Sequence, residues 1–364
     1  MKHLLREIRN NPLLWMLAFV PVLFLCHRLK PESHTLLFIL AVLAIVPLAA
    51  LLSLATESVA TRTGDAVGGL LNATLGNLTE LVIALAALHS GQYMLVKASV
   101  AGAIVANTLF VLGASFLFGG LKHHLQEYNR VNARFQAALL FLATVALLVP
   151  SAVREADSAE GAAFTQTLSV ALAVLLLVAY GLGLAFSLKT HRELFASVES
   201  GESGESPLPI GVAVGTLAFV TVLIALVSEV FVDSAQQAAV AFGMTPAFVG
   251  FVVVSLVGGA GEMGAAFSAA RKNRLDLSVG IALGAASQIA LFVGPVLVLL
   301  SYILGPEPMN LQFWPGAVVM MLIGTMAAAL ITSSGRSTWF VGVFVLMVYL
   351  VFAMTLYLLP PRAH

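Results

Sequence analysis

The sequence contains few charged residues. Asp, Glu, Lys and Arg make up 10% of its 364 residues, while hydrophobic residues make up 60%. Because a soluble domain carries about 25% charged residues, this composition excludes a soluble globular protein and indicates a polytopic membrane protein. The single cysteine, Cys26, excludes an internal disulfide, and no CxxC or HExxH pattern is present. The net charge is zero and no long basic run occurs, so we expect no nucleic acid partner.

Eleven apolar runs are long enough to cross about 30 Å of hydrocarbon. The first follows a basic N-terminus that resembles a secretory signal, but no A-x-A cleavage site follows it, so we interpret it as a retained helix. We therefore predict an all-α integral membrane protein with about eleven transmembrane helices. The runs lie at residues 13–28, 35–58, 67–89, 94–119, 133–153, 164–188, 208–233, 246–270, 276–303, 312–333 and 337–359.

Lys and Arg residues are distributed unevenly over the predicted loops. With the N-terminus in the cytoplasm, thirteen of them fall inside and five outside. Cytoplasmic loops of membrane proteins carry the excess of Lys and Arg, so this orientation is favoured. We expect a multi-pass protein of the bacterial inner (plasma) membrane with a cytoplasmic N-terminus.

A motif with a glutamate inside an apolar run occurs twice. Gly76-Asn77-Leu78-Thr79-Glu80 and Gly258-Gly259-Ala260-Gly261-Glu262 superpose when the sequence is shifted by 182 residues. Because the second glutamate helix comes five helices after the first, the two cross the membrane in opposite directions. We predict two inverted five-helix repeats, residues 35–188 and 208–364, with an extra N-terminal helix in 1–34 and an acidic cytoplasmic linker at 189–207.

The two glutamates are the strongest candidates for a functional site. A carboxyl group at membrane depth is costly and marks such a site by default, and matched repeats point to an ion site at their interface. Glycines weaken both helices, and backbone freed at a helix break is tolerated at this depth only where it lines a cavity or meets a ligand. The candidate ion- and proton-binding side chains are Glu80, Glu262, Asn107, Gln288, Asn77 and Ser287, with backbone at Gly76 and Gly258.

These candidates offer oxygen atoms to a cation. Two carboxylates, two amides and several carbonyls could supply the roughly six to eight oxygens that Ca²⁺ prefers, and no soft ligand favours copper or zinc. Two simpler interpretations stay open. The glycines could serve close helix packing, and Asn107 or Gln288 could form only interhelical hydrogen bonds.

The segment GGLLNATLGNLTELVIAL at 68–85 resembles the first core motif of the Ca²⁺/H⁺ antiporters of the cation/proton exchanger (CAX) family, within the Ca²⁺/cation antiporter superfamily. The stretches ATESVATRTGD at 55–65, KASVAGAIVANTLFVLG at 97–113 and ARKNRLDLSVGIALGAASQIALFV at 270–293 are similar to further family segments. The resemblance covers most of the chain. It implies that Glu80 and Glu262 are the essential ion-binding acids, and that Glu57 and Glu229 belong to two long gating helices.

The second motif departs from the family pattern. Family members usually have GNAAEH, where this chain has Gly259 in place of Asn and Met263 in place of His. Ser and Thr of the ALGSATQ element are likewise Ala285 and Ser287 here. We expect these changes to alter the cation preference or the proton affinity of the second half of the site.

The function predicted from the sequence is secondary active exchange of Ca²⁺ for H⁺ by alternating access, with both ions competing for the two glutamates. Ca²⁺ is the transported substrate, no cofactor is expected, and the sequence is compatible with a homo-oligomer. The nearest alternative is an Na⁺/Ca²⁺ exchanger of the same superfamily. An intramembrane hydrolase would need a nucleophile or further acid–base group at the same depth, and no His or Asp lies there. A channel would conduct without a counter-ion gradient.

Overall fold

The computed structural model describes residues 11–63, 65–152, 159–190 and 208–358. Most of the predicted linker, from residue 191 onward, therefore lies outside the described residues, as do residues 1–10. The elements, including short 3₁₀ or π-helical segments labelled η, are η1 (Pro12–Ala18), α2 (Phe19–Leu29), α3 (His34–Arg62), α4 (Asp65–Leu75), α5 (Leu78–His89), α6 (Tyr93–Val105), η2 (Ala106–Val111), α7 (Leu112–His123), β1 (Leu125–Glu127), α8 (Arg130–Ala152), α9 (Ala159–Ala185), η4 (Phe186–Thr190), α11 (Ile210–Ala241), α12 (Pro246–Phe248), η5 (Val249–Val254), α13 (Ser255–Gly258), α14 (Ala260–Arg271), α15 (Leu275–Gln288), η6 (Ile289–Val293), α16 (Gly294–Leu304), α17 (Pro315–Thr332), β2 (Arg336–Thr338) and α18 (Trp339–Leu358).

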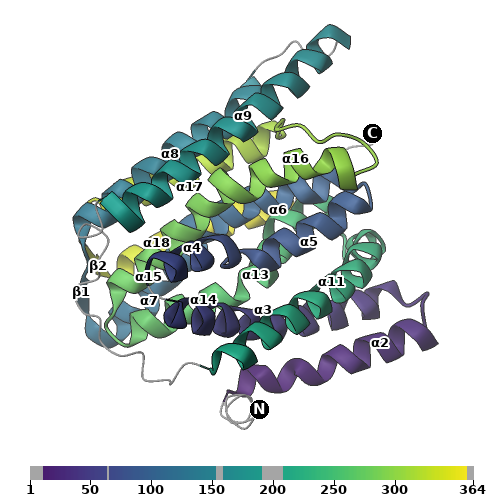
Figure 1. The fold of residues 1–364 in the computed structure, drawn as a ribbon, viewed down its shortest axis with the longest axis horizontal. Helices are drawn as coiled ribbons and strands as arrows, with labels where there is room; N and C mark the ends of the chain where they lie inside the picture. Colours follow the sequence, from purple (N-terminus) through teal and green to yellow (C-terminus); the bar gives the residue numbers. More distant parts are fainter. Residues whose placement is uncertain (1–10, 64, 153–158, 191–207, 359–364) are drawn as a thin grey trace.

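The described residues form a helical membrane fold. They contain nine helices that are long and apolar enough to span a membrane, and a tenth span if a bent helix pair is included. The predicted number of eleven stays a prediction, because the run at 67–89 is divided between α4 and α5. In Figure 1, α2, α3 and α11 lie along one edge of the molecule and α8 and α9 along the other, with the shorter helices between them.

The two longest helices, α3 and α11, pack along each other. Both are apolar over most of their length, which is typical of helices enclosed by other helices and lipid rather than facing water. The rings of Phe38 and Phe231 stack between them with centroids 5.1 Å apart. This pair forms an edge layer beside the broken helices, which hold the candidate site.

Two membrane-length runs are interrupted at their glycines. The run at 67–89 stops being helical between Leu75 and Leu78, and the run at 246–270 is bent by 60° where Gly259 separates α13 from α14. Gly76 lies in the first break, and Glu80 lies in the first turn of α5, the helix that follows this break.

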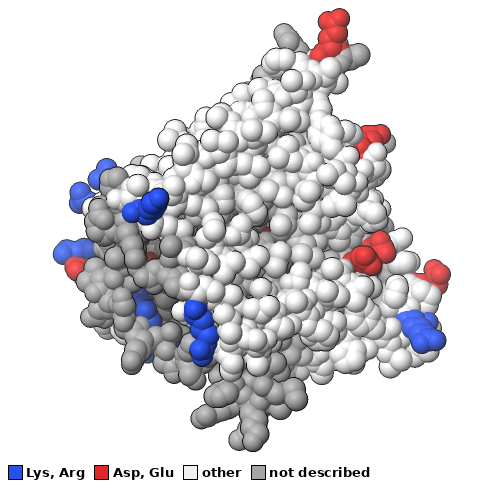
Figure 2. Space-filling model, viewed as in Figure 1, with Lys and Arg blue, Asp and Glu red and all other residues white. Residues whose placement is uncertain are grey.

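The ends of the molecule differ in charge. Figure 2 shows a broad uncharged band between an edge with several Lys and Arg residues, where Figure 1 places β1 and β2, and an opposite edge with most of the visible Asp and Glu residues. The turn between α14 and α15 adds Arg271, Lys272 and Arg274 to the basic end. The uncharged band has the composition of a surface that faces lipid.

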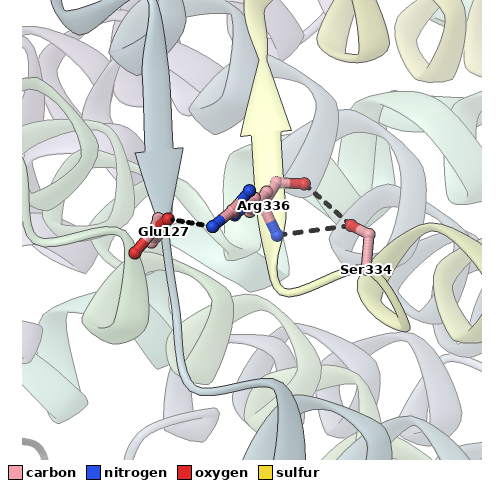
Figure 3. Close-up of polar contacts among 3 residues, drawn as sticks. All are labelled: Glu127, Ser334 and Arg336. Carbon is pink, nitrogen blue, oxygen red and sulfur yellow. Dashed lines mark hydrogen bonds and ion pairs between the residues drawn. The ribbon is translucent and has the colours of Figure 1, made fainter.

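Loops tie the two halves of the sequence together at both ends. At the basic end, β1 pairs antiparallel with β2, and Arg336 forms a 2.9 Å ion pair with Glu127 while Ser334 hydrogen-bonds its backbone (Figure 3). At the other end, the hydroxyl of Tyr93 donates to the carbonyl of Glu307 at 2.6 Å, and Lys97 donates to Asn310 at 2.6 Å. The sequence analysis did not predict these ties, because single short strands and loop contacts have no strong periodic signal.

Candidate functional site

Each candidate glutamate lies in the first turn of the helix that follows a break. Glu80 is the third residue of α5 and is 8% exposed, and Glu262 is the third residue of α14. Free backbone N–H groups and the positive end of the helix dipole favour an anionic group at this position. The Glu80 carboxyl group lies beside the second break, with Oε1 3.4 Å from the Cβ position of Gly259, three residues before Glu262. The fold therefore brings together the two residues that the 182-residue repeat had paired.

Each glutamate side chain contacts the helix break in the other half of the sequence. The position that a Cβ atom would take at Gly258 lies 3.1 Å from Cγ of Glu80, and the same position at Gly76 lies 3.4 Å from Oε1 of Glu262. Each carboxyl group thus lies against the glycine break of the opposite half. A Cβ atom at Gly258 would crowd the Glu80 side chain, whereas the tightest contact of a Cβ atom at Gly76 would be the carbonyl oxygen of Asn72, at 2.7 Å.

A hydrogen bond between two amide side chains connects the first helix break to the second half of the sequence. Asn77, at the N-terminus of α5, donates from Nδ2 to Oε1 of Gln288 at 2.5 Å. Gln288 is the last residue of α15, and its Oε1 lies 3.5 Å from the Cβ position of Gly76. Asn77 is 2% exposed. This hydrogen bond fixes two of the predicted site residues beside the Glu262 carboxyl group.

Two other predicted residues have different hydrogen-bond partners. Asn107, 3% exposed in η2, donates from Nδ2 to the carbonyl of Ala103 at 3.1 Å. Ser287 donates to the carbonyl of Leu283 at 2.8 Å. Both bonds run within the residue's own helix. Neither of these bonds connects the two helix breaks, unlike the bond between Asn77 and Gln288.

Three buried side-chain oxygens at the breaks have no hydrogen-bond partner among the described residues. They are Oδ1 of Asn77, Oε1 of Glu80 and Oε2 of Glu262. A buried polar atom without a partner costs roughly 1–3 kcal/mol, and more when it is charged. Unpaired oxygens from two carboxyl groups and an amide form a set that a hard cation or protons can satisfy.

The two acids attributed to gating helices are not among these buried oxygens. Glu57 on α3 and Glu229 on α11 are both exposed. The residues just before them, Thr56 and Ser228, are instead buried, and their hydroxyls have no hydrogen-bond partner in the described part of the chain. The sequence analysis missed these hydroxyls, although the repeated pair of a hydroxyl residue and Glu could have revealed them.

The helices that follow the two glutamates are packed differently. In α6, a Cβ atom at Gly102 would overlap the backbone of Phe251 in η5. Gly284 is the matching position in α15, and a Cβ atom there would meet no described atom within 4 Å. In the first half the element before the break, α4, packs against α3, where Gly68 approaches the backbone of Ala60. A Cβ atom would therefore clash at Gly102, whereas it would meet no described atom at Gly284.

Comparison with known proteins places the chain in a family. The model of the family described as sodium/calcium exchanger protein matches residues 33–189 and again residues 212–358. The chain is 38% identical to a Ca(2+)/H(+) antiporter of Aphanothece halophytica, over 97% of this chain and 98% of that protein. The solved structure of native YfkE is 33% identical and covers 95% of this chain and 100% of its own, with a TM-score of 0.82. The solved H+/Ca2+ exchanger CAX, 18% identical over 95% of this chain and 91% of its own with a TM-score of 0.71, shares the fold. These relatives are transporters rather than enzymes, and the chain itself belongs to the sodium/calcium exchanger protein family.

Proposed function

We propose that this protein exchanges Ca²⁺ for H⁺ across a membrane at one site formed by Glu80 and Glu262. The observation that carries the proposal is the set of three buried, unpaired oxygens of Asn77, Glu80 and Glu262 at two crossed helix breaks. Asn107, Gln288 and Ser287, with backbone at Gly76 and Gly258, complete the proposed ligand set around these oxygens.

The proposed exchange requires only that Ca²⁺ and protons do not occupy this site at the same time. Two carboxyl groups that repel each other in a medium of low dielectric favour neutralisation by protons when no cation is bound. A divalent cation between them favours the ionised forms, so cation binding releases protons and proton binding releases the cation. If the site is exposed to one side of the membrane at a time, this exclusion couples the two fluxes. An inward proton gradient would then drive Ca²⁺ out of the cytoplasm.

The open contact at Gly284 supports alternating access. We infer that the segments 35–188 and 208–364 are inverted repeats, an inference that the two family matches at 33–189 and 212–358 support. In such a pair, the contact that α6 makes with η5 should be matched in another state by α15 with α4. With the N-terminus in the cytoplasm of a bacterial cell, the open contact would lie on the cytoplasmic half of the membrane.

Protons are favoured over sodium as the counter-ion. The relatives with 38% identity are named Ca(2+)/H(+) antiporters, whereas the sodium–calcium exchanger structures share 16–18% identity and show the fold alone. The first core motif, with Asn77 and Glu80 in place, is also of the proton-coupled type. A channel would not require two carboxyl groups that bind protons and the cation in turn.

Transport by inverted membrane vesicles tests the proposed function. We expect uptake of ⁴⁵Ca²⁺ when a pH gradient, acidic inside, is imposed, and no uptake with a Na⁺ gradient alone. A matched sample with the pH gradient collapsed by an ionophore provides the control. Uptake that follows the Na⁺ gradient would overturn the assignment in favour of an Na⁺/Ca²⁺ exchanger. Flux that is independent of both gradients would indicate a channel.

Alanine at the two amide positions should have partial effects. Gln288→Ala removes the acceptor of the 2.5 Å bond from Asn77, and Asn107→Ala removes an amide that bonds only within its own helix. We expect Gln288→Ala to weaken the apparent Ca²⁺ affinity about tenfold, with a smaller effect of Asn107→Ala. Initial rates of ⁴⁵Ca²⁺ uptake over a range of Ca²⁺ concentrations measure both. If both variants kept the wild-type Ca²⁺ affinity and pH dependence of uptake, the two residues would serve only in helix packing.

A further inference from the structure

The matching elements that precede the two helix breaks pack on different partners. Shifting the sequence by 182 residues places Gly68 on Gly250. A Cβ atom at Gly68, in α4, would lie 2.1 Å from the carbonyl oxygen of Ala60 in α3. A Cβ atom at Gly250, in η5, would instead lie 2.5 Å from Cβ of Ala98 in α6. In the first half this glycine thus packs on the long helix α3, and in the second half it packs on a helix of the opposite half.

An exchange of roles between the repeats predicts where Gly250 packs in the other conformation. The Thr-Glu pair at 56–57 in α3 matches the Ser-Glu pair at 228–229 in α11, and this shift of 172 residues places Ala60 on Val232. In inverted repeats, the contacts of one half become those of the other half when the site opens to the opposite side. In that conformation Gly250 should leave α6 and approach the carbonyl oxygen of Val232.

A side chain occupies the carbonyl group of Val232 in the present structure. Gln92, in the turn between α5 and α6, donates from Nε2 to this oxygen at 3.0 Å. The turn itself is held by its own backbone, because the N–H of Gln92 donates to the carbonyl of Ala87 at 2.9 Å and Gly91 has a positive φ of 69°. The Gln92 amide therefore ties a well-defined turn to the middle of a long helix from the other half of the sequence.

We propose that Gln92 is a latch that holds the protein in the present conformation, because its amide occupies the Val232 carbonyl that Gly250 approaches in the other conformation. The inference rests on the proposed function, since it assumes that the site is exposed to one side of the membrane at a time. The amide and the backbone of Gly250 cannot both contact this carbonyl, so the hydrogen bond has to break before η5 packs on α11. An interaction made in only one of two conformations shifts their ratio toward that conformation. Gln92 is thus a positioning residue that acts through α11.

Two matching leucines report which conformation the protein adopts. Leu277, the third residue of α15, is 41% exposed, whereas its counterpart Leu95, the third residue of α6, is 4% exposed. The carbonyl oxygen of Leu95 lies 2.9 Å from the Cβ position of Gly250, so η5 packs against this residue. When η5 leaves α6 and α4 packs on α15, Leu95 should become accessible and Leu277 should become covered.

Cysteine labelling of the purified full chain in detergent tests the latch. Leu277→Cys and Leu95→Cys are made separately in a Cys26→Ser background, and the rate of reaction with a water-soluble maleimide is measured for each. Gln92→Met keeps the length of the side chain but removes the N–H donor. We expect it to lower the ratio of the rate at position 277 to the rate at position 95 about fivefold, which is the effect of one typical net hydrogen bond. The rate at position 277 should itself fall, which local loosening around Gln92 would not cause.

Gln166→Met is the matched control for this change. Gln166 in α9 donates from Nε2 to the hydroxyl of Tyr302 at 2.9 Å and to the carbonyl of Met309 at 3.2 Å, and neither acceptor belongs to α11. This variant should leave both labelling rates unchanged. Gln92→Ala should repeat the effect of Gln92→Met, and it decides the question if Gln92→Met does not fold.

The proposal is overturned if both Gln92 variants leave the labelling rate at position 277 at its wild-type value, or if Gln166→Met lowers that rate equally. Labelling requires neither a transported cation nor a pH gradient. Failure of proton-coupled uptake in vesicles would therefore contradict the proposed function without deciding the role of Gln92.

Discussion

Glu80→Gln and Glu262→Gln should each insert and fold yet lose Ca²⁺/H⁺ exchange. Both side chains lie at the start of a helix with an unpaired, buried carboxyl oxygen. Glutamine keeps the shape but removes the charge, and it cannot take up and release the exchanged proton. Loss of one charge facing a divalent cation in a buried site costs about 3 kcal/mol or more, so we expect at least a hundredfold weaker cation binding. Proton-driven ⁴⁵Ca²⁺ uptake in inverted vesicles measures this loss.

An exposed acid provides the matched control for these variants. Glu160→Gln makes the same chemical change in the first turn of α9, at a position exposed to solvent, and should leave uptake at the wild-type rate. Membrane insertion is compared by the amount of protein in the vesicles and by its elution from a size-exclusion column. Near-normal exchange by either glutamine variant at wild-type abundance would rule out a shared two-carboxylate site.

Valine at Gly102 and at Gly284 should have different consequences, although the two glycines occupy matching positions in the repeat. A Cβ atom at Gly102 would overlap the backbone of Phe251, which cannot move without displacing η5. Overpacking of this kind costs about 1–3 kcal/mol or more, so we expect Gly102→Val to give little folded protein. Gly284 has no described atom within 4 Å of its Cβ position. Gly284→Val should therefore fold, but it should block the docking of α4 on α15 and stop exchange.

Gly264 is the control for the glycine-to-valine change itself. It lies in α14 with no described atom within 4 Å of its Cβ position and is exposed. Gly264→Val should fold and should keep most of its exchange activity. Folding is measured by thermal unfolding in detergent and exchange by ⁴⁵Ca²⁺ uptake. Equal uptake by the Gly284 and Gly264 variants would show that α4 does not close on α15 during transport.

The sequence by itself determined the class of the protein and its candidate acids. Apolar runs of membrane length follow directly from the hydrocarbon thickness, so the predicted runs at 312–333 and 337–359 lie close to the observed bounds of α17 and α18. Glu80 and Glu262 stand out because a carboxyl group at that depth is costly, and the 182-residue repeat pairs them through their matching positions along the chain. Gly91 and Asn273, both with positive φ, lie in short gaps between the predicted runs.

Tertiary structure alone decided how these residues meet. The crossing of each glutamate to the glycine of the opposite half, and the bond from Asn77 to Gln288, join segments that lie far apart in the sequence. Hydrophobic periodicity describes one helix at a time and contains no information about such contacts. The difference between the closed contact at Gly102 and the open one at Gly284 is likewise tertiary, because two matching glycines are packed differently in a single conformation of the chain.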